Sequence, residues 1–128
     1  ALPDDQTSQL RAAVMLANFG RQDEAVVLLD KLLTRNPASG EAYTILGGIH
    51  SSRGDLPRSR ECFEHALAYA RSADEVSLAN LKLGEMDLRL NNPTAAEARF
   101  QAAIKVNPRL TETVQALRRA KMSAPVAP

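Results

Sequence analysis

Two short segments decide the fold of this chain: YTILGGIH at residues 43–50 and SRECFEHA at residues 59–66. Each combines large apolar residues with small ones at helical spacing. Gly54 stands between the segments, where a tight turn between two helices favours glycine. The pattern predicts two closely packed helices, in which Gly47 lets the backbones approach. We expect Phe63 to fill the space between this helix pair and the next.

The same pattern occurs three times along the chain. A shift of 34 residues aligns Gly20 with Gly54, and a further shift of 37 residues aligns Phe63 with Phe100. Each shift brings small residues onto small ones and large apolar residues onto large ones. A period of this length is typical of helix pairs that stack into a solenoid. The recurring signature residues are Gly20, Ala25, Pro37, Leu46, Gly47, Gly54, Phe63, Ala66, Leu83, Gly84, Ala96, Phe100, Ala103 and Pro108.

Capping residues and helix breakers divide the chain into helices. Asp55 and Asn92 each stand just before a proline-led helix start, and Ser72-x-x-Glu75 has the form of a capping box. We predict an all-α fold: a right-handed α-solenoid of three antiparallel helix pairs with a terminal solvating helix, seven helices in all. The predicted helices cover residues 6–18, 22–34, 40–52, 56–70, 73–90, 93–105 and 109–121.

The length of 128 residues fits one domain. We place this domain at residues 6–122, after a disordered start at residues 1–5 and before a flexible Pro/Ala tail at residues 123–128. The predicted repeats cover residues of about 6–39, 40–76 and 77–110, and the capping helix covers residues 109–121.

Composition limits the kinds of partner and compartment. The formal net charge is only +1, so the chain has no overall positive charge to attract nucleic acid, and we predict no nucleic-acid partner. The apolar stretches are too short for direct membrane insertion. Cys62 is the only cysteine, so an internal disulfide is excluded, and a lone thiol fits the cytoplasm best. The missing initiator Met indicates processing or excision, so a periplasmic location after removal of an export signal stays open.

Three side chains could bind a metal or act as nucleophiles: Cys62, His65 and His50. Cys62 and His65 lie three residues apart on one helix and could share a metal in principle. Because Phe63 and Ala66 are the core positions of that helix, we expect Cys62 and His65 to face the rim or solvent. We expect His50 to pack between helices. The pair has no third, orienting group, and the sequence therefore predicts no enzyme, no metal and no cofactor.

The repeated signature resembles the tetratricopeptide repeat family over residues 6–110. The second copy reads Tyr43-x-x-Leu46-Gly47-x-x-His50 and then Ser59-x-x-x-Phe63-x-x-Ala66. The third reads Leu83-Gly84, Ala96-x-x-x-Phe100-x-x-Ala103 and Pro108. Departures from the family pattern are Asn80, Asp87 and His50 at aromatic positions, and Arg71 at a proline position. The resemblance implies a protein–protein interaction module in which the first helix of each pair lines a concave groove.

The predicted groove is apolar at both ends, with small residues between. Gly48 would let the backbone or a bulky side chain of a partner approach closely. The natural guest is an apolar or amphipathic segment of a protein or peptide partner. The predicted groove residues are Leu10, Val14, Ala17, Thr44, Gly48, Ser51, Leu78, Leu81, Lys82, Glu85 and Leu88.

Two further comparisons within the family narrow the hypothesis. Some family members bind the C-terminal carboxylate of heat-shock chaperones with a clamp of Lys and Asn side chains. The clamp positions correspond here to Leu10, Val14, Ile45, Leu78 and Lys82, and only Lys82 suits that role. A three-repeat domain with a hydrophobic groove is instead similar to bacterial type III secretion chaperones. That similarity implies a bacterial adaptor or a secretion or assembly chaperone. The alternative is an oligomerisation or scaffolding segment of a larger protein, and a homo-oligomer stays open.

Overall fold

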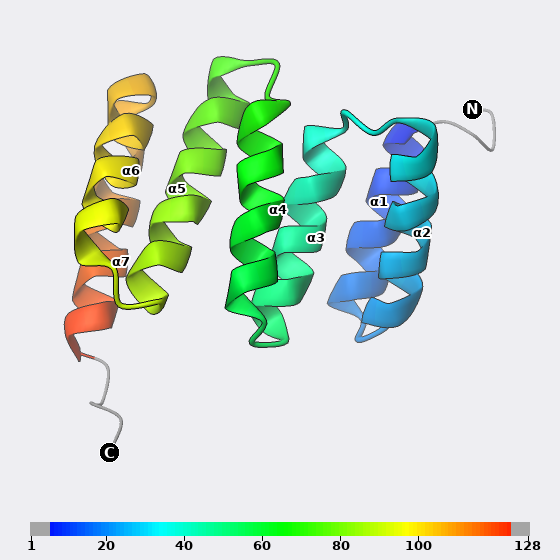
Figure 1. Ribbon diagram of the computed structural model, residues 1–128, viewed down its shortest axis with the longest axis horizontal. Helices are drawn as coiled ribbons and strands as arrows, with labels where there is room; N and C mark the ends of the chain where they lie inside the picture. The colour runs from blue at the N-terminus through cyan, green and yellow to red at the C-terminus, as the bar shows by residue number, and fades with distance from the viewer. Residues whose placement is uncertain (1–5, 124–128) are drawn as a thin grey trace. The chain divides into compact units, whose positions relative to one another are not determined.

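The computed structural model describes residues 6–123, and these residues form an all-α fold (Figure 1). The predictions for residues 1–5 and 124–128 lie outside the described residues. In the described part, the predicted seven α-helices are confirmed, and one short 3₁₀ helix is added. In chain order they are α1 (Gln6–Asn18), α2 (Gln22–Arg35), α3 (Gly40–Ser52), α4 (Leu56–Ala68), α5 (Ala73–Arg89), α6 (Pro93–Val106), η1 (Pro108–Leu110) and α7 (Thr111–Ser123).

Capping side chains fix where several helices begin. Asp55 accepts a hydrogen bond from the backbone N–H of Arg58, and Asn92 accepts one from that of Ala95, both at 3.3 Å. Ser72 caps α5 in the same way, by accepting from the N–H three residues ahead at 3.2 Å. These bonds satisfy amides that have no partner within the helix. The first six helices begin at the predicted residues, and α2 does so without a side-chain cap.

The last helix begins later and ends later than predicted. Pro108 opens the 3₁₀ turn η1, and Asn107 caps it by accepting a hydrogen bond from the N–H of Arg109 at 3.1 Å. The tighter turn moves the start of α7 to Thr111. The helix includes Ser123, which the prediction assigned to the tail.

The chain divides into two compact units, Ala1–Tyr69 and Ala70–Pro128. In unit 1, α1 packs against α2, α3 packs against α4, and both α1 and α2 contact α3. In unit 2, α5 packs against α6 and α7. That both units belong to one right-handed solenoid domain stays a prediction.

The three turns that join the helices of each pair share one geometry. Gly20, Gly54 and Asn91 adopt φ angles of +80°, +81° and +63°. In each turn, the N–H of this residue donates to the carbonyl three residues back, and the next N–H donates to the carbonyl five residues back, at 2.8–3.3 Å. This is the Schellman motif. Glycine adopts the left-handed conformation at little cost and asparagine tolerates it, so the third copy closes the same turn without glycine.

Two of the helix pairs place a phenylalanine ring directly against a glycine. Phe63 of α4 and Phe100 of α6 are both buried. A Cβ atom placed on Gly47 would lie 2.6 Å from Cε1 of Phe63, and one placed on Gly84 would lie 2.5 Å from Cε1 of Phe100. The prediction put the rings between adjacent pairs, whereas these contacts lie within each pair. The glycine is required because the ring occupies the space of a side chain.

The α1–α2 pair meets the same packing problem with different residues. Ala13 and Leu29 occupy the positions that the 34-residue shift aligns with Gly47 and Phe63, and both are fully buried. The smaller leucine side chain leaves room for the methyl group of alanine. The three pairs thus follow one rule, in which a small residue on the first helix faces a large one on the second.

The closing helix α7 covers the apolar face of unit 2. Val114 is fully buried in one cluster with Leu81 and Phe100. The Arg118 guanidinium lies 5.9 Å from the centroid of the Phe100 ring and forms an ion pair with Glu97 at 2.5 Å. The other side of α7 is exposed to solvent, as predicted for a terminal helix.

Candidate partner-binding surface

The first helices of unit 1, α1 and α3, contact each other and carry six of the predicted groove residues. We call these the first-helix surface: Leu10, Val14 and Ala17 of α1, with Thr44, Gly48 and Ser51 of α3. Val14 is 40% exposed, and Gly48 is also exposed. The hydroxyl of Thr44 donates to the carbonyl of Gly40 at 2.9 Å, so this polar group is satisfied within the helix. The α3 part of the surface therefore presents small side chains.

Gly48 has no packing role among the described residues. A Cβ atom placed on it would meet no heavy atom within 4 Å, in contrast to its neighbour Gly47. Its backbone is helical, so no positive φ requires glycine. Glycine inside a helix costs about 0.5–1 kcal/mol relative to alanine. Nothing in the described fold offsets that cost, and the space above the backbone is open to another molecule.

The α1 residues of the first-helix surface differ in how much they offer a partner. Leu10 and Ala17 are half-buried and pack against the core cluster of unit 1. Val14 lies between them along the helix and is the most exposed of the three. Of these three predicted residues, Val14 is therefore the one that can contact a partner without opening the core.

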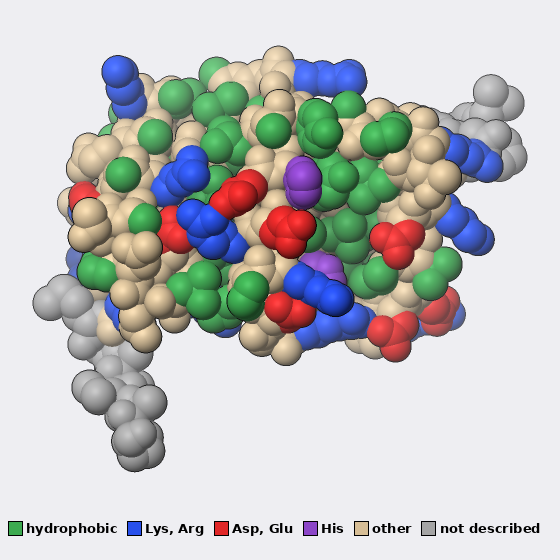
Figure 2. Space-filling view, viewed as in Figure 1, with side chains coloured by type: hydrophobic (Ala, Val, Ile, Leu, Met, Phe, Trp, Pro, Cys, Tyr) green, Lys and Arg blue, Asp and Glu red, His purple; other side chains and the backbone are tan. Residues whose placement is uncertain are grey.

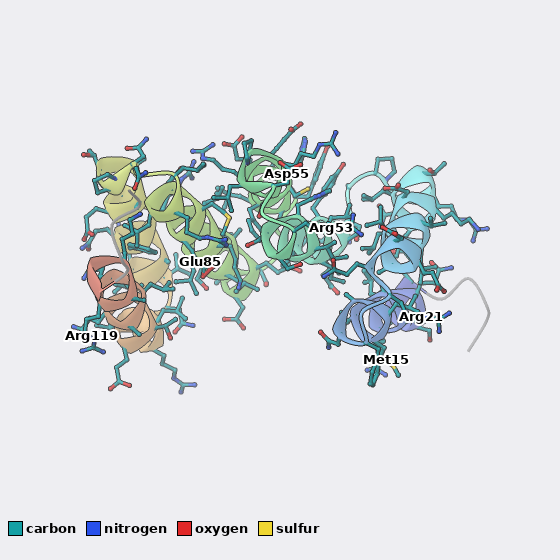
Figure 3. The ribbon with its side chains drawn as sticks, turned by 90° about the horizontal axis from the view of Figure 1, so that it is seen from below. Met15, Arg21, Arg53, Asp55, Glu85 and Arg119 are labelled. Carbon is teal, nitrogen blue, oxygen red and sulfur yellow. The ribbon has the colours of Figure 1, made fainter. Side chains whose placement is uncertain are left out.

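The predicted groove residues of α5 divide into two groups. Leu81 is only 7% exposed and lies in the core of unit 2, so its assignment to the groove is wrong. Leu88 packs against the same cluster. The physical reason is that both α6 and α7 contact α5, so its apolar face is wider than the sequence indicated. Leu78 is exposed, while Lys82 and Glu85 are half-buried. Glu85 of α5 is labelled in Figure 3.

Cys62 is more buried than predicted. It is half-buried and packs against the core cluster of unit 1. Burial, assisted by the nearby charge of Glu61, raises the pKa of the Cys62 thiol to about 11. The thiol is therefore protonated at neutral pH, and only the thiolate is a nucleophile or a metal ligand.

The two histidines do not join Cys62 in a reactive cluster. His65 is exposed and stacks on Tyr43, with 4.7 Å between the ring centroids. His50 is half-buried in α3. Within residues 6–123, no three His, Cys, Asp or Glu side chains are grouped so that they could hold a metal ion.

Sequence reasoning missed an aromatic cluster at one end of the α3–α4 pair. The rings of Tyr43, His65 and Tyr69 stack on one another, with centroids 4.7–6.4 Å apart and interplanar angles of 11–28°. Burial, together with the neighbouring Tyr69 and Cys62, raises the pKa of Tyr43. The spacing of His65 and Tyr69, one helical turn apart, was the available signal.

Charges of both signs are interspersed with apolar side chains on the face seen in Figure 2. None of the helices among residues 6–123 is both long and apolar enough to span a membrane.

The chain matches no known protein-family model and no curated protein.

Proposed function

We propose that this chain is a tetratricopeptide-type repeat protein without enzymatic activity, which binds an apolar or amphipathic segment of a partner protein on the first-helix surface. Gly48 is the observation that carries the proposal. It is an exposed glycine in the interior of α3 that lowers helix stability and has no internal packing role. A partner segment that packs directly on the helix backbone supplies the reason for its presence.

The chemistry of the surface indicates the kind of guest. Val14, Thr44, Gly48 and Ser51 carry no charge, and Val14 adds an exposed apolar side chain. An uncharged surface of this kind suits the apolar side of a helix or an extended apolar segment. Such a guest is consistent with an adaptor, or with a bacterial secretion or assembly chaperone that shields an apolar segment.

The experiment compares two substitutions at the same position. The partner is first captured from the native host and identified by mass spectrometry, and its bound segment is then made as a peptide. Gly48→Leu should weaken binding of that peptide by at least about tenfold in titration calorimetry, because the new side chain fills the contact space. Gly48→Ala adds a single methyl group and should weaken binding less. Both variants should remain folded, since the space above Gly48 is open.

Unchanged affinity in Gly48→Leu, with helicity intact by circular dichroism, contradicts the proposal. The alternative, an oligomerisation or scaffolding segment of a larger protein, would instead predict a stable homo-oligomer in light scattering.

A further inference from the structure

Helix α2 presents a partly apolar face to solvent. Glu24, Val27, Leu28 and Lys31 follow i, i+3, i+4, i+7 spacing and therefore share one side of the helix. Val27 is 54% exposed, and Leu28 is half-buried against the core of unit 1. The face lines a hollow of about 430 Å³ whose walls are Leu16, Asp23, Glu24, Val27, Leu28 and Lys31. An apolar centre thus lies between an acidic and a basic side chain.

The charges on this face are arranged symmetrically about its centre. The midpoint between Val27 and Leu28 is equally far from Glu24 and from Lys31, at about 5 Å along the helix axis. A two-fold axis through this midpoint would lay a second α2 antiparallel on the first. Val27 of each copy would then lie opposite Leu28 of the other, and Glu24 of each copy would lie opposite Lys31 of the other. The placement of charged and apolar residues therefore makes this face complementary to a second copy of itself.

The carboxylate of Glu24 can accept a second cation. Its two oxygens accept hydrogen bonds from the Arg21 guanidinium at 2.8 and 2.7 Å, yet the side chain is still 55% exposed. A carboxylate has about four lone-pair sites, so Lys31 of another copy can bind without displacing Arg21. The adjacent Asp23 is already engaged with Arg53 at 2.5 Å, and the pairing does not need it. Figure 3 shows Arg21 at the α1–α2 end of unit 1.

The helix dipole explains only part of this pattern. It favours an acid such as Glu24 in the first turn of α2. It accounts neither for the exposed Val27 in the middle of the face nor for Lys31, which precedes the last turn. Packing against an equivalent helix accounts for both, because it buries Val27 and pairs Lys31 with Glu24 of the other copy.

We propose that unit 1 self-associates through this face, forming a two-fold dimer in which two α2 helices pack antiparallel. The contact is separate from the first-helix surface and does not depend on the proposed peptide binding. Because one helix face per chain is small for an interface, we expect weak association, with a dissociation constant on the order of 10–100 µM.

Charge reversal tests the pairing directly. Sedimentation velocity of the full chain over a concentration series should show a monomer–dimer equilibrium that weakens at high salt. Lys31→Glu alone and Glu24→Lys alone should each weaken self-association by about tenfold or more, because symmetry converts two attractions into two repulsions. An equimolar mixture of the two variants should dimerise again, since only the mixed pair restores both opposite-charge contacts.

Any of three results would overturn the proposal. The wild-type chain stays monomeric up to millimolar concentration, each variant dimerises as strongly as the wild type, or the mixture dimerises no more strongly than either variant alone. Circular dichroism should show both variants folded, because the two side chains are exposed. Gly48→Leu serves as the control and should leave self-association unchanged. If it abolishes the dimer, the contact lies on the first-helix surface and the assignment to α2 is wrong.

Discussion

Gly47 and Gly48 are adjacent glycines of α3, and the same substitution should change stability in opposite directions at the two positions. An alanine at Gly47 would place its Cβ 2.6 Å from the ring of Phe63, whereas an alanine at Gly48 would meet nothing within 4 Å. Both substitutions gain the helix propensity of alanine, which is worth about 0.5–1 kcal/mol. Only Gly47→Ala forces a buried aromatic ring to move.

The size of the difference follows from packing. Phe63 is 1% exposed, so its ring is enclosed by other side chains and can move only by displacing them. Overpacking of a filled core costs about 1–3 kcal/mol. Gly47→Ala should therefore lower the free energy of unfolding by about 0–2.5 kcal/mol after the propensity gain, with the middle of the two ranges giving about 1 kcal/mol. Gly48→Ala should raise it by about 0.5–1 kcal/mol.

Urea unfolding followed by far-UV circular dichroism measures both changes. A further variant gives an internal check, because the α1–α2 pair combines alanine with leucine at the equivalent positions. Adding Phe63→Leu to Gly47→Ala should recover part of the loss, as a positive coupling in a double-mutant cycle. Equal effects of alanine at the two glycines, or no coupling with Phe63→Leu, would refute the packing rule.

Three more predictions concern single contacts. Phe100→Ala should cost about 3–5 kcal/mol by urea unfolding; a cost below 1 kcal/mol would place the ring outside the core. Asn92→Ala should cost about 1 kcal/mol by removing the cap of α6, and Asn92→Asp, which keeps an acceptor, should cost less. At pH 8 the folded Cys62 thiol should react with iodoacetamide roughly 100-fold more slowly than in urea, because its pKa is raised from 9.0 to about 11. Since the folded thiol stays protonated, stability should fall as the pH rises from 9 to 11. A reactivity midpoint near pH 9 in the folded protein would contradict this.

Helix positions could be read from the sequence because they depend on local chemistry. Asp55 and Asn92 cap their helices through bonds to amides three residues ahead, and Gly20 and Gly54 close turns that need a positive φ. Each of these signals lies within a few residues of the boundary that it sets. The start of α7 was harder to predict, because a 3₁₀ turn after Pro108 uses the same residues as a helical start.

The candidate site was predicted less well because it depends on how helices are rotated against each other. The apolar stripe of α5 did not reveal that α6 and α7 would bury Leu81, which only tertiary packing decides. The stacking of Tyr43 on His65 joins two helices and likewise has no signal in either helix alone. A Cβ atom on Gly48 would meet nothing within 4 Å, and the place of Gly48 in a groove stays a prediction.

The most direct test of the proposed binding role is a chemical-shift map of the isotope-labelled chain titrated with the captured partner segment. The account predicts that the largest amide shifts fall on α1 and α3, at Val14, Thr44, Gly48 and Ser51. Amides of the α2 face, around Val27, should change little. Shifts that are confined to α2, or to unit 2, would contradict the claim that the first-helix surface binds the partner.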